Sequence, residues 1–360
     1  MAASRRCGRG RMTIELALLL AQDGIANGAI YVLVAVGIVL VFLVTRIIFV
    51  PFGDLVAYAS LTLASLEVGK PAGTLALVTL LAVLALAAET ISLLRRNALH
   101  RWPRAALIWF ALPMLPVALA WLTAGTILPP LARVALTVAL MLPVAPLCYR
   151  LAFRPIANAP VLVLLMVAVV LHFALSGVAL IAFGPEGERP QPLTSAVFDV
   201  GNMIFPGQTL LMLGASALAV LALALFFGAT ITGRALRATA VNRVGARLVG
   251  IRPGVAGNAA FLIASALAAI SGVLIGPVTT LFYDSGFVIG LKAFVGAIIG
   301  GLVSYPGAAL GALFVGLLES FTAFWNSALK EVAVFALLVP VLILRSALQR
   351  GGSEAEEEEL

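Results

Sequence analysis

The stretch GLKAFVGAIIGGLVSYPGAALGALFVGLLES, residues 290–320, decides the fold of this chain. It combines small and apolar residues with one charge near each end, Lys292 and Glu319, and an interruption, SYPG, at 304–307. Pro306 lacks a backbone N–H and disfavours helix at the residue before it, so the sequence predicts two short helices that meet at a break. Apolar segments interrupted by glycine and proline tend to line a pathway through a membrane-embedded bundle.

The composition of the whole chain agrees with this interpretation. Of the 360 residues, 62% are hydrophobic and 11% are charged, whereas a soluble domain carries about 25% charged residues. Backbone groups in lipid must be paired within the chain, and apolar runs of about 20 residues have the length of a transmembrane helix. The sequence therefore predicts an all-α polytopic transmembrane helix bundle of about 8–10 spans, with broken and re-entrant helices.

Length and flanking residues place the expected spans. They are 25–45, 74–94, 105–124, 131–149, 160–182, 208–231, 257–283, 288–304, 306–322 and 330–346. The segment 53–69 is apolar but short, which favours a re-entrant helix, and 13–23 is a candidate for a short interfacial helix. The chain then divides into a basic extension over 1–12, a transmembrane domain over 13–350 and a disordered acidic tail over 351–360.

Basic residues gather in a few loops, at 95–104, 150–154 and 234–252, and near both chain ends. Cytoplasmic loops of membrane proteins carry the excess of Lys and Arg, so these loops and both termini are expected in the cytoplasm. The net charge of +7 follows from these loops and does not indicate nucleic-acid binding. A cytoplasmic N-terminus requires that 53–69 does not cross the membrane, and it would leave Arg46 outside, against the rule.

The loop 232–256, TGRALRATAVNRVGARLVGIRPGVA, is the most unusual soluble segment. It is basic and rich in helix-forming residues, which favours two short helices joined at a glycine. The alternative is a plain basic loop, but such a loop would not need two helical pieces. We therefore interpret it as a docking element for a cytoplasmic partner, with Arg234, Arg237, Gly245 and Gly250 as candidate residues.

Polar residues inside apolar segments are the other candidates. Gly296 and Gly300, and likewise Gly307 and Gly311, form small-xxx-small faces that let helix backbones approach closely. A charge in a membrane helix costs about 2.5–3.5 kcal/mol, so Lys292 and Glu319 face protein or water, or snorkel to the helix ends. A structural pair is favoured over contact with a substrate.

Asp54 follows Pro51 and Gly53 at the start of the short segment 53–69. A carboxylate at this position can cap a helix and interact with its dipole, and this role is favoured over ligand contact.

The sequence contains no nucleotide-binding, metalloprotease or nucleophile-elbow motif, and it has only two cysteines and two histidines. It predicts no enzyme activity, no metal site and no cofactor held by this chain. If ATP is used, another subunit must bind it.

Taken in order, several segments resemble the permease subunits of the branched-chain amino-acid ABC transporters, a family that also includes urea and amide permeases. The resembling segments are 27–42, 49–54, 149–160, 233–251, 290–320 and 329–345. The resemblance leaves out both ends and about 71–148, which is longer than expected and is predicted to hold one or two additional helices. Val241 stands where an acidic residue is usual, and Val50, Pro51 and Phe52 replace the usual asparagine and histidine.

The resemblance implies an importer in the bacterial inner membrane whose permease carries a hydrophobic or branched-chain amino acid, or a similar small polar solute. The implied partners are a second permease subunit, identical or a paralogue, two cytoplasmic ABC ATPases that use ATP and Mg²⁺, and an external solute-binding protein. Asn242, Gly245 and Gly250 match the family's coupling loop. The candidates for the pathway and its broken helices are Phe52, Gly53, Asp54, Lys292, Gly296, Gly300, Gly301, Pro306, Gly307, Gly311 and Glu319.

An ion-coupled secondary transporter is the alternative. It would need carboxylates inside the membrane for ion coupling, and the candidates are Glu15, Glu89 and Glu319. It would leave the basic loop 232–256 unexplained.

Overall fold

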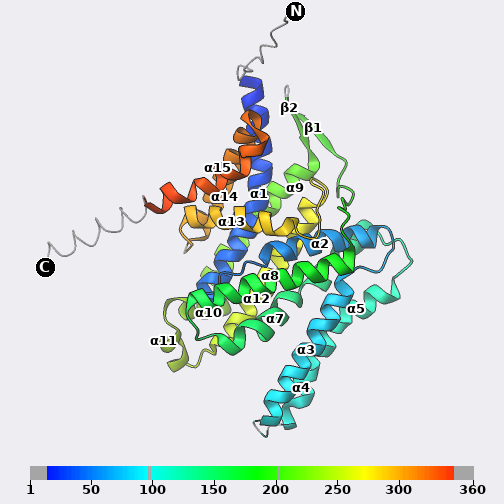
Figure 1. The fold of residues 1–360 in the computed structure, drawn as a ribbon, viewed down its shortest axis with the longest axis vertical. Coiled ribbons are helices and arrows are strands. Elements are labelled where there is room, and N and C mark those ends of the chain that lie inside the picture. The colour runs from blue at the N-terminus through cyan, green and yellow to red at the C-terminus, as the bar shows by residue number, and fades with distance from the viewer. Residues whose placement is uncertain (1–13, 96, 98, 201–202, 303, 344–360) are drawn as a thin grey trace, which may run out of the picture.

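The computed structural model describes residues 14–95, 97, 99–200, 203–302 and 304–343. The expected extension over 1–12 and acidic tail over 351–360 lie outside the described residues. Helices dominate (Figure 1): α1 Ile14–Thr45, α2 Phe52–Glu67, α3 Thr74–Arg95, α4 Trp102–Ala106, α5 Leu112–Leu122, α6 Pro130–Met141, α7 Val144–Cys148, α8 Val161–Phe183, α9 Gly207–Ala229, α10 Ile231–Val241, α11 Arg243–Leu248, α12 Pro253–Ile275, α13 Ser285–Gly300, α14 Tyr305–Trp325 and α15 Lys330–Ala336.

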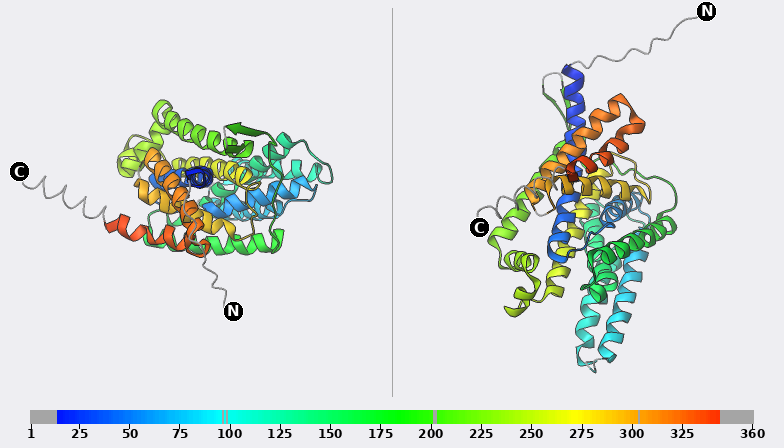
Figure 2. Two further views of the ribbon diagram at one scale, coloured as in Figure 1. Left: turned by 90° about the horizontal axis from the view of Figure 1, so that it is seen from above. Right: turned by 60° about the vertical axis from the view of Figure 1, so that its left-hand side comes forward.

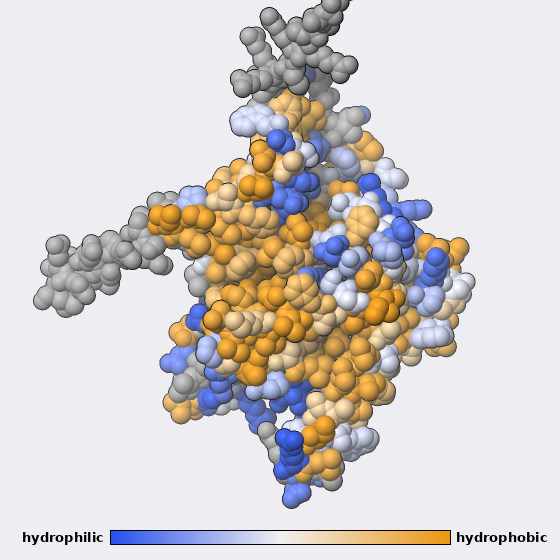
Figure 3. Space-filling model, viewed as in Figure 1, coloured by the Kyte–Doolittle hydropathy of each residue, from blue (hydrophilic) through white to orange (hydrophobic). Residues whose placement is uncertain are grey.

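Eight helical segments of the described chain are long and apolar enough to cross a membrane, which confirms the all-α polytopic bundle. They are Glu15–Thr45, Thr74–Arg95, Trp102–Leu122, Pro130–Ile156, Val161–Phe183, Gly207–Ala229, Pro253–Ile275 and Tyr305–Trp325. The shorter α13 is also apolar. Figure 3 shows an apolar surface over the middle of one face, with hydrophilic residues near α10 and α11 and at the tip of the α3–α4 hairpin.

The first helix is longer than the sequence predicts. The stretch 13–23 is not a separate interfacial helix, because residues 14–45 form one continuous helix of 32 residues. Gly24 and Gly28 do not end it. They lie directly against the backbone of Leu317 and Leu313 in α14, so their missing side chains let α1 and α14 pack closely.

The basic loops lie together at one end of the molecule, here called the basic end. The guanidinium of Arg46, just after α1, donates a hydrogen bond to the carbonyl of Ala240 in α10, with 3.3 Å between the atoms. Arg154 lies next to Gly254 at the start of α12, and it lines one pocket with Arg95 at the end of α3. The expectation that Arg46 lies opposite the basic loops is therefore wrong.

The other end carries the long loop 184–206. Part of this loop forms an antiparallel hairpin, β1 Val197–Val200 and β2 Met203–Pro206, with Val197 opposite Pro206, so this end is called the hairpin end. Glu67 at the end of α2 forms an ion pair of 2.9 Å with Arg133 and accepts a hydrogen bond of 2.9 Å from the backbone N–H of Gln191. The end of α2 therefore lies at the hairpin end.

These contacts change the interpretation of 53–69. The chain is at the basic end at Arg46 and at the hairpin end at Glu67. This segment therefore runs from one end of the bundle to the other and is not re-entrant. The 16-residue α2 is short for a membrane span, but Phe52 to Leu66 are all buried inside the bundle. Irregular backbone at membrane depth is tolerated when protein surrounds it, and the turn before α2 supplies the missing length.

Within 71–148, α3 and the antiparallel α4–α5 span form a helical hairpin that projects from the body (Figures 1 and 2), whereas α6 and α7 pack against the body at α2 and α12. The α4–α5 span is continuous through Leu107–Ala111. Large apolar side chains on this hairpin are exposed, among them Leu115 and Trp121, each 66% exposed. Such a surface fits lipid contact rather than water.

Candidate functional site

The predicted docking loop does form two short helices, α10 and α11, but they meet at Asn242 and not at a glycine. The Asn242 side-chain oxygen accepts a hydrogen bond of 2.9 Å from the backbone N–H of Gly245. An asparagine at the first position of a helix satisfies a backbone donor that the helix leaves unpaired. Gly250 follows α11 with a φ of 87°, a backbone conformation that glycine adopts without strain.

The coupling loop, 232–256, exposes both charge and apolar surface. Arg234 and Arg237 are exposed, and Arg234 donates a hydrogen bond of 3.1 Å to the carbonyl of Ala229. Val241, Leu248 and Val249 are 81%, 84% and 75% exposed. This loop joins α9 to α12, and exposed apolar side chains grouped on a loop are typical of surfaces that bind a protein partner.

The structure brings the coupling loop and the predicted helix break together. A pocket of about 500 Å³ lies between them, lined by Leu43, Val44, Arg46, Phe227, Leu236, Arg237, Ala240, Val241, Ser304, Tyr305 and Pro306. The Tyr305 ring stacks on Phe227 at the end of α9, with 5.1 Å between ring centroids. Gly233 of α10 lies against the backbone of Phe226 and Phe227, so a displacement of α10 would act on the start of α14 through Phe227.

The break itself lies between Gly300 and Tyr305. Gly301 ends α13 with a φ of 103°, and the Ser304 side chain accepts a hydrogen bond of 3.2 Å from the N–H of Gly307. Pro306 lies in the first turn of α14, where a proline stabilises a helix start. The sequence thus placed the interruption correctly, and its chemistry is a glycine stop followed by a serine cap.

The predicted small-residue faces lie against each other. A side chain at Gly296 would overlap the backbone of Ala312, and one at Gly311 would overlap the carbonyl of Gly296. Gly300 and Gly307 likewise lie against each other's backbone, with no room for a side chain at either position. The backbones of α13 and α14 therefore touch along this face, as small residues at helix interfaces in membranes allow.

Lys292 and Glu319 form an ion pair between α13 and α14, with 2.6 Å between Nζ and Oε1. Tyr31 of α1 donates a hydrogen bond of 2.6 Å to the second carboxylate oxygen. Lys292 is 5% exposed and Glu319 is 8% exposed, so neither side chain snorkels to a helix end. The pair borders a pocket of about 360 Å³ that also reaches Thr280 and Ser285 near the start of α13.

Asp54 is paired instead of capping its helix. Its carboxylate lies 2.7 Å from Nδ1 of His172 in α8, and the His172 ring stacks on Phe287 of α13. Phe52 is fully buried and lies against Gly37 of α1. These contacts make Asp54 and Phe52 parts of the packed core.

His172 was not identified from the sequence as a partner of Asp54. The signal was present, because an ionisable residue in the middle of an apolar span usually has a partner inside the bundle. Gly53 was identified, and it allows α2 to approach the backbone of Gly286 at the start of α13.

These features define a class of protein. The chain is a polytopic membrane subunit with broken helices in its core and an exposed helical loop at one end that shares a pocket with the break. Such an arrangement is suited to a transport subunit on which a partner protein acts at the end that carries this loop.

Comparison with known proteins gives the family. The family model for the permease component of branched-chain amino acid transport systems matches residues 20–343. The high-affinity branched-chain amino acid transport system permease protein LivH of Escherichia coli K12 is 32% identical over 219 residues, which cover 58% of this chain and 70% of LivH. BraD of Pseudomonas aeruginosa, a permease protein of the same kind of system, is 31% identical over 215 residues, with the same coverage. No solved structure matched significantly.

The chain belongs to this family of branched-chain amino acid transport permease components, and it is a permease subunit of an ABC importer.

Proposed function

We propose that this chain forms the translocation pathway for a branched-chain or similar hydrophobic amino acid, together with a second permease subunit. Two ATPase subunits bind and hydrolyse ATP with Mg²⁺, and this chain holds neither nucleotide nor metal. An external solute-binding protein delivers the solute. The names of the relatives support the solute class, since LivH and BraD serve high-affinity branched-chain amino acid transport.

The observation that carries the coupling role is the pocket that the coupling loop and the helix break line together. Arg237, Ala240 and Val241 share one pocket with Tyr305 and Pro306. An ATPase that binds the exposed Leu248 and Val249 would move α11 and α10, and α10 would move the start of α14. Because the helix stops at Gly301, with a φ of 103°, and starts again at Tyr305, the break is the part of this helix pair where the angle can change.

The distribution of arginines indicates which end of the molecule faces the cytoplasm. The basic end is proposed to be cytoplasmic, because it carries the arginine-rich loops. The hairpin end is then external, and α1 begins there, which reverses the expectation of a cytoplasmic N-terminus. The loop 184–206 is the proposed docking surface for the solute-binding protein. It is tied to the bundle by the backbone pairing of Glu188 with Leu281 and by a hydrogen bond of 2.8 Å from Arg189 to the carbonyl of Pro277.

The ion-coupled alternative is less well supported. Glu319 is paired with Lys292, and Glu89 accepts hydrogen bonds from Arg150, so the charge of each carboxylate is already compensated. A carboxylate that binds and releases a coupling ion needs access to that ion along the pathway.

The test is reconstitution of the permease with its partner subunits and binding protein in proteoliposomes. The Leu248→Asp variant places a charge where we expect an apolar contact. It should lower ATP-driven leucine uptake and binding-protein-stimulated ATP hydrolysis by about tenfold or more, the size expected for a buried apolar anchor of an interface. Ile127→Asp is the matched control, because Ile127 is 83% exposed at the hairpin end.

Equal uptake by Leu248→Asp and the control would contradict docking at α11. Uptake driven by an ion gradient without ATP would contradict the importer mechanism and favour the secondary transporter.

A further inference from the structure

A second basic pocket lies at the basic end, where one of its arginines, Arg154, is next to Gly254 at the end of the coupling loop. It has a volume of about 560 Å³ and is lined by Ala88, Glu89, Ile91, Ser92, Arg95, Arg150, Arg154 and Pro155. Three arginines and one glutamate line it, so it carries two net positive charges. The last turns of α3 form one wall, and the segment that follows α7 forms the other.

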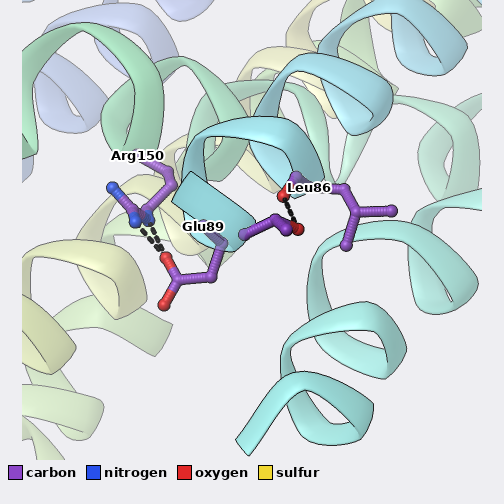
Figure 4. A network of polar contacts seen from close by, with 4 residues as sticks. Leu86, Glu89 and Arg150 are labelled. Carbon is purple, nitrogen blue, oxygen red and sulfur yellow. Dashed lines mark hydrogen bonds and ion pairs between the residues drawn. The ribbon is translucent and has the colours of Figure 1, made fainter. Parts of the chain in front are cut away.

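One of these arginines is held in place by its surroundings. The Arg150 guanidinium donates from Nε and Nη2 to the same oxygen of Glu89, with 2.9 Å for the Nε contact (Figure 4). Its central carbon also lies 5.8 Å from the ring centre of Trp109. Arg150 is only 8% exposed, whereas Arg95 and Arg154 are exposed. The pocket therefore has an ion pair at its base and two cationic side chains, Arg95 and Arg154, in contact with solvent.

The position of the pocket limits what can occupy it. It lies at the end of α3, a helix that crosses the membrane at the projecting hairpin. Ile91 and Leu94, on the same turns of α3, are each 52% exposed. A site with cations at the end of a membrane helix and exposed apolar side chains beside it matches a molecule with an anionic head and an apolar tail.

We propose that this pocket binds the phosphate group of an anionic phospholipid from the leaflet at the basic end. The phosphate oxygens accept hydrogen bonds from Arg95 and Arg154, and Ser92 offers a hydroxyl group in the same pocket. The acyl chains lie along Ile91 and Leu94. Arg150 lies at the base, where Glu89 holds it in position and balances its charge. A lipid at this place would hold the projecting hairpin against the rest of the bundle.

The test measures lipid binding by the full chain purified in detergent. Phosphatidylglycerol and phosphatidylcholine are titrated separately, and bound lipid is counted by native mass spectrometry. The double variant Arg95→Gln with Arg154→Gln is compared with Arg101→Gln with Arg104→Gln. The control pair removes the same charge from exposed positions in and next to the α3–α4 turn that do not line the pocket.

The wild type should bind phosphatidylglycerol more tightly than phosphatidylcholine. The Arg95 and Arg154 double variant should weaken phosphatidylglycerol binding about 25-fold, or about fivefold for each arginine, while the control pair changes it less than about twofold. If the double variant is not recovered folded, the single Arg95→Gln variant is used instead. Arg95 is exposed and is the last residue of α3, so its replacement should leave the fold intact.

Three results would overturn the proposal. Equal loss of lipid binding in the control pair would mean a general effect of surface charge. Competition by inorganic phosphate at concentrations similar to those of the lipid would mean a site for a soluble anion. Unchanged lipid affinity, with a loss of ATPase binding in the double variant, would mean a protein contact.

Discussion

Lys292 of α13 and Glu319 of α14 lie 2.6 Å apart, Nζ to Oε1, in a part of the bundle where both side chains are less than one-tenth exposed. Tyr31 of α1 hydrogen-bonds the same carboxylate, so one ion pair connects three helices. Glu331, next to the start of α15, lies 3.7 Å from the same ammonium group. The pair joins α13 to α14 at a position away from the glycine contacts at the break.

Removing one charge of this pair should cost more than removing both. Glu319→Gln leaves the Lys292 ammonium buried without its closest counter-ion, and breaking a buried pair typically costs about 3–5 kcal/mol. We expect a clear fall in the melting temperature of the purified permease. The double variant Lys292→Met with Glu319→Gln should recover part of this loss. A double variant no more stable than the single one would show that the pair is not a structural unit.

The contact between α13 and α14 should tolerate no side chain at Gly311. Gly311→Ala forces its new methyl group against the carbonyl of Gly296, so α14 must move away and the assembly should be destabilised. Gly214→Ala in α9 is the matched control, because its added methyl group has no atom of another described segment within 4 Å. It should be neutral or stabilise α9 by about 0.5–1 kcal/mol. Similar melting temperatures for both variants would contradict the close backbone contact.

The Asp54–His172 pair should respond unequally to substitution of its two members. His172→Leu leaves the Asp54 carboxylate, which is 1% exposed, without a partner in the bundle, and the folded yield should fall strongly. Asp54→Asn keeps a hydrogen-bonding group of the same size beside the imidazole and should cost less. If Asp54→Asn instead abolished uptake while its melting temperature stayed unchanged, Asp54 would have a role in transport rather than in packing.

Thiol labelling tests the crossing of 46–67. In a variant whose Cys7 and Cys148 are replaced, single cysteines at Arg46, Lys70 and Asn97 are exposed to an impermeant reagent from each side of the membrane. The structure predicts that positions 46 and 97 are labelled from the same side and position 70 from the other. A re-entrant α2, with Arg46 on the side of Lys70, would give the opposite result for position 46.

The loop at the hairpin end should make stability depend on pH. Burial raises the pKa of the Glu188 carboxyl above its ordinary value of 4.5, and nearby Lys70 partly opposes this. The folded state therefore holds this proton more tightly than the unfolded state, and its stabilising effect is lost as the pH rises through the folded pKa. Glu188→Gln should match the wild type near about pH 4 and melt higher at about pH 8. The exposed Glu186→Gln should show no such difference.

Local chemistry was enough to predict several parts of the structure. The lengths of the apolar runs indicated most of the helical spans, although 288–304 corresponds to the shorter α13 and 330–346 is not among the eight span-length helices of the described residues. The glycines and proline of 300–307 indicated the break, because these residues restrict the backbone wherever they occur. The alanine-rich composition of 232–256 indicated two helices. Their junction was assigned to the wrong residue because a glycine stop and an asparagine cap are both compatible with that sequence.

The tertiary structure decided the remaining features. Asp54 and His172 are 118 residues apart, and Lys292 and Glu319 are 27 apart, so the sequence shows the charges but not their partners. The same limit explains 53–69, because hydropathy and length describe a segment but not what surrounds it. A 16-residue helix can serve as part of a crossing only because other helices cover it and the turn before it reaches Arg46 at the basic end. The sequence alone determined that the chain is a helical membrane protein, and packing between distant segments determined which way each one runs.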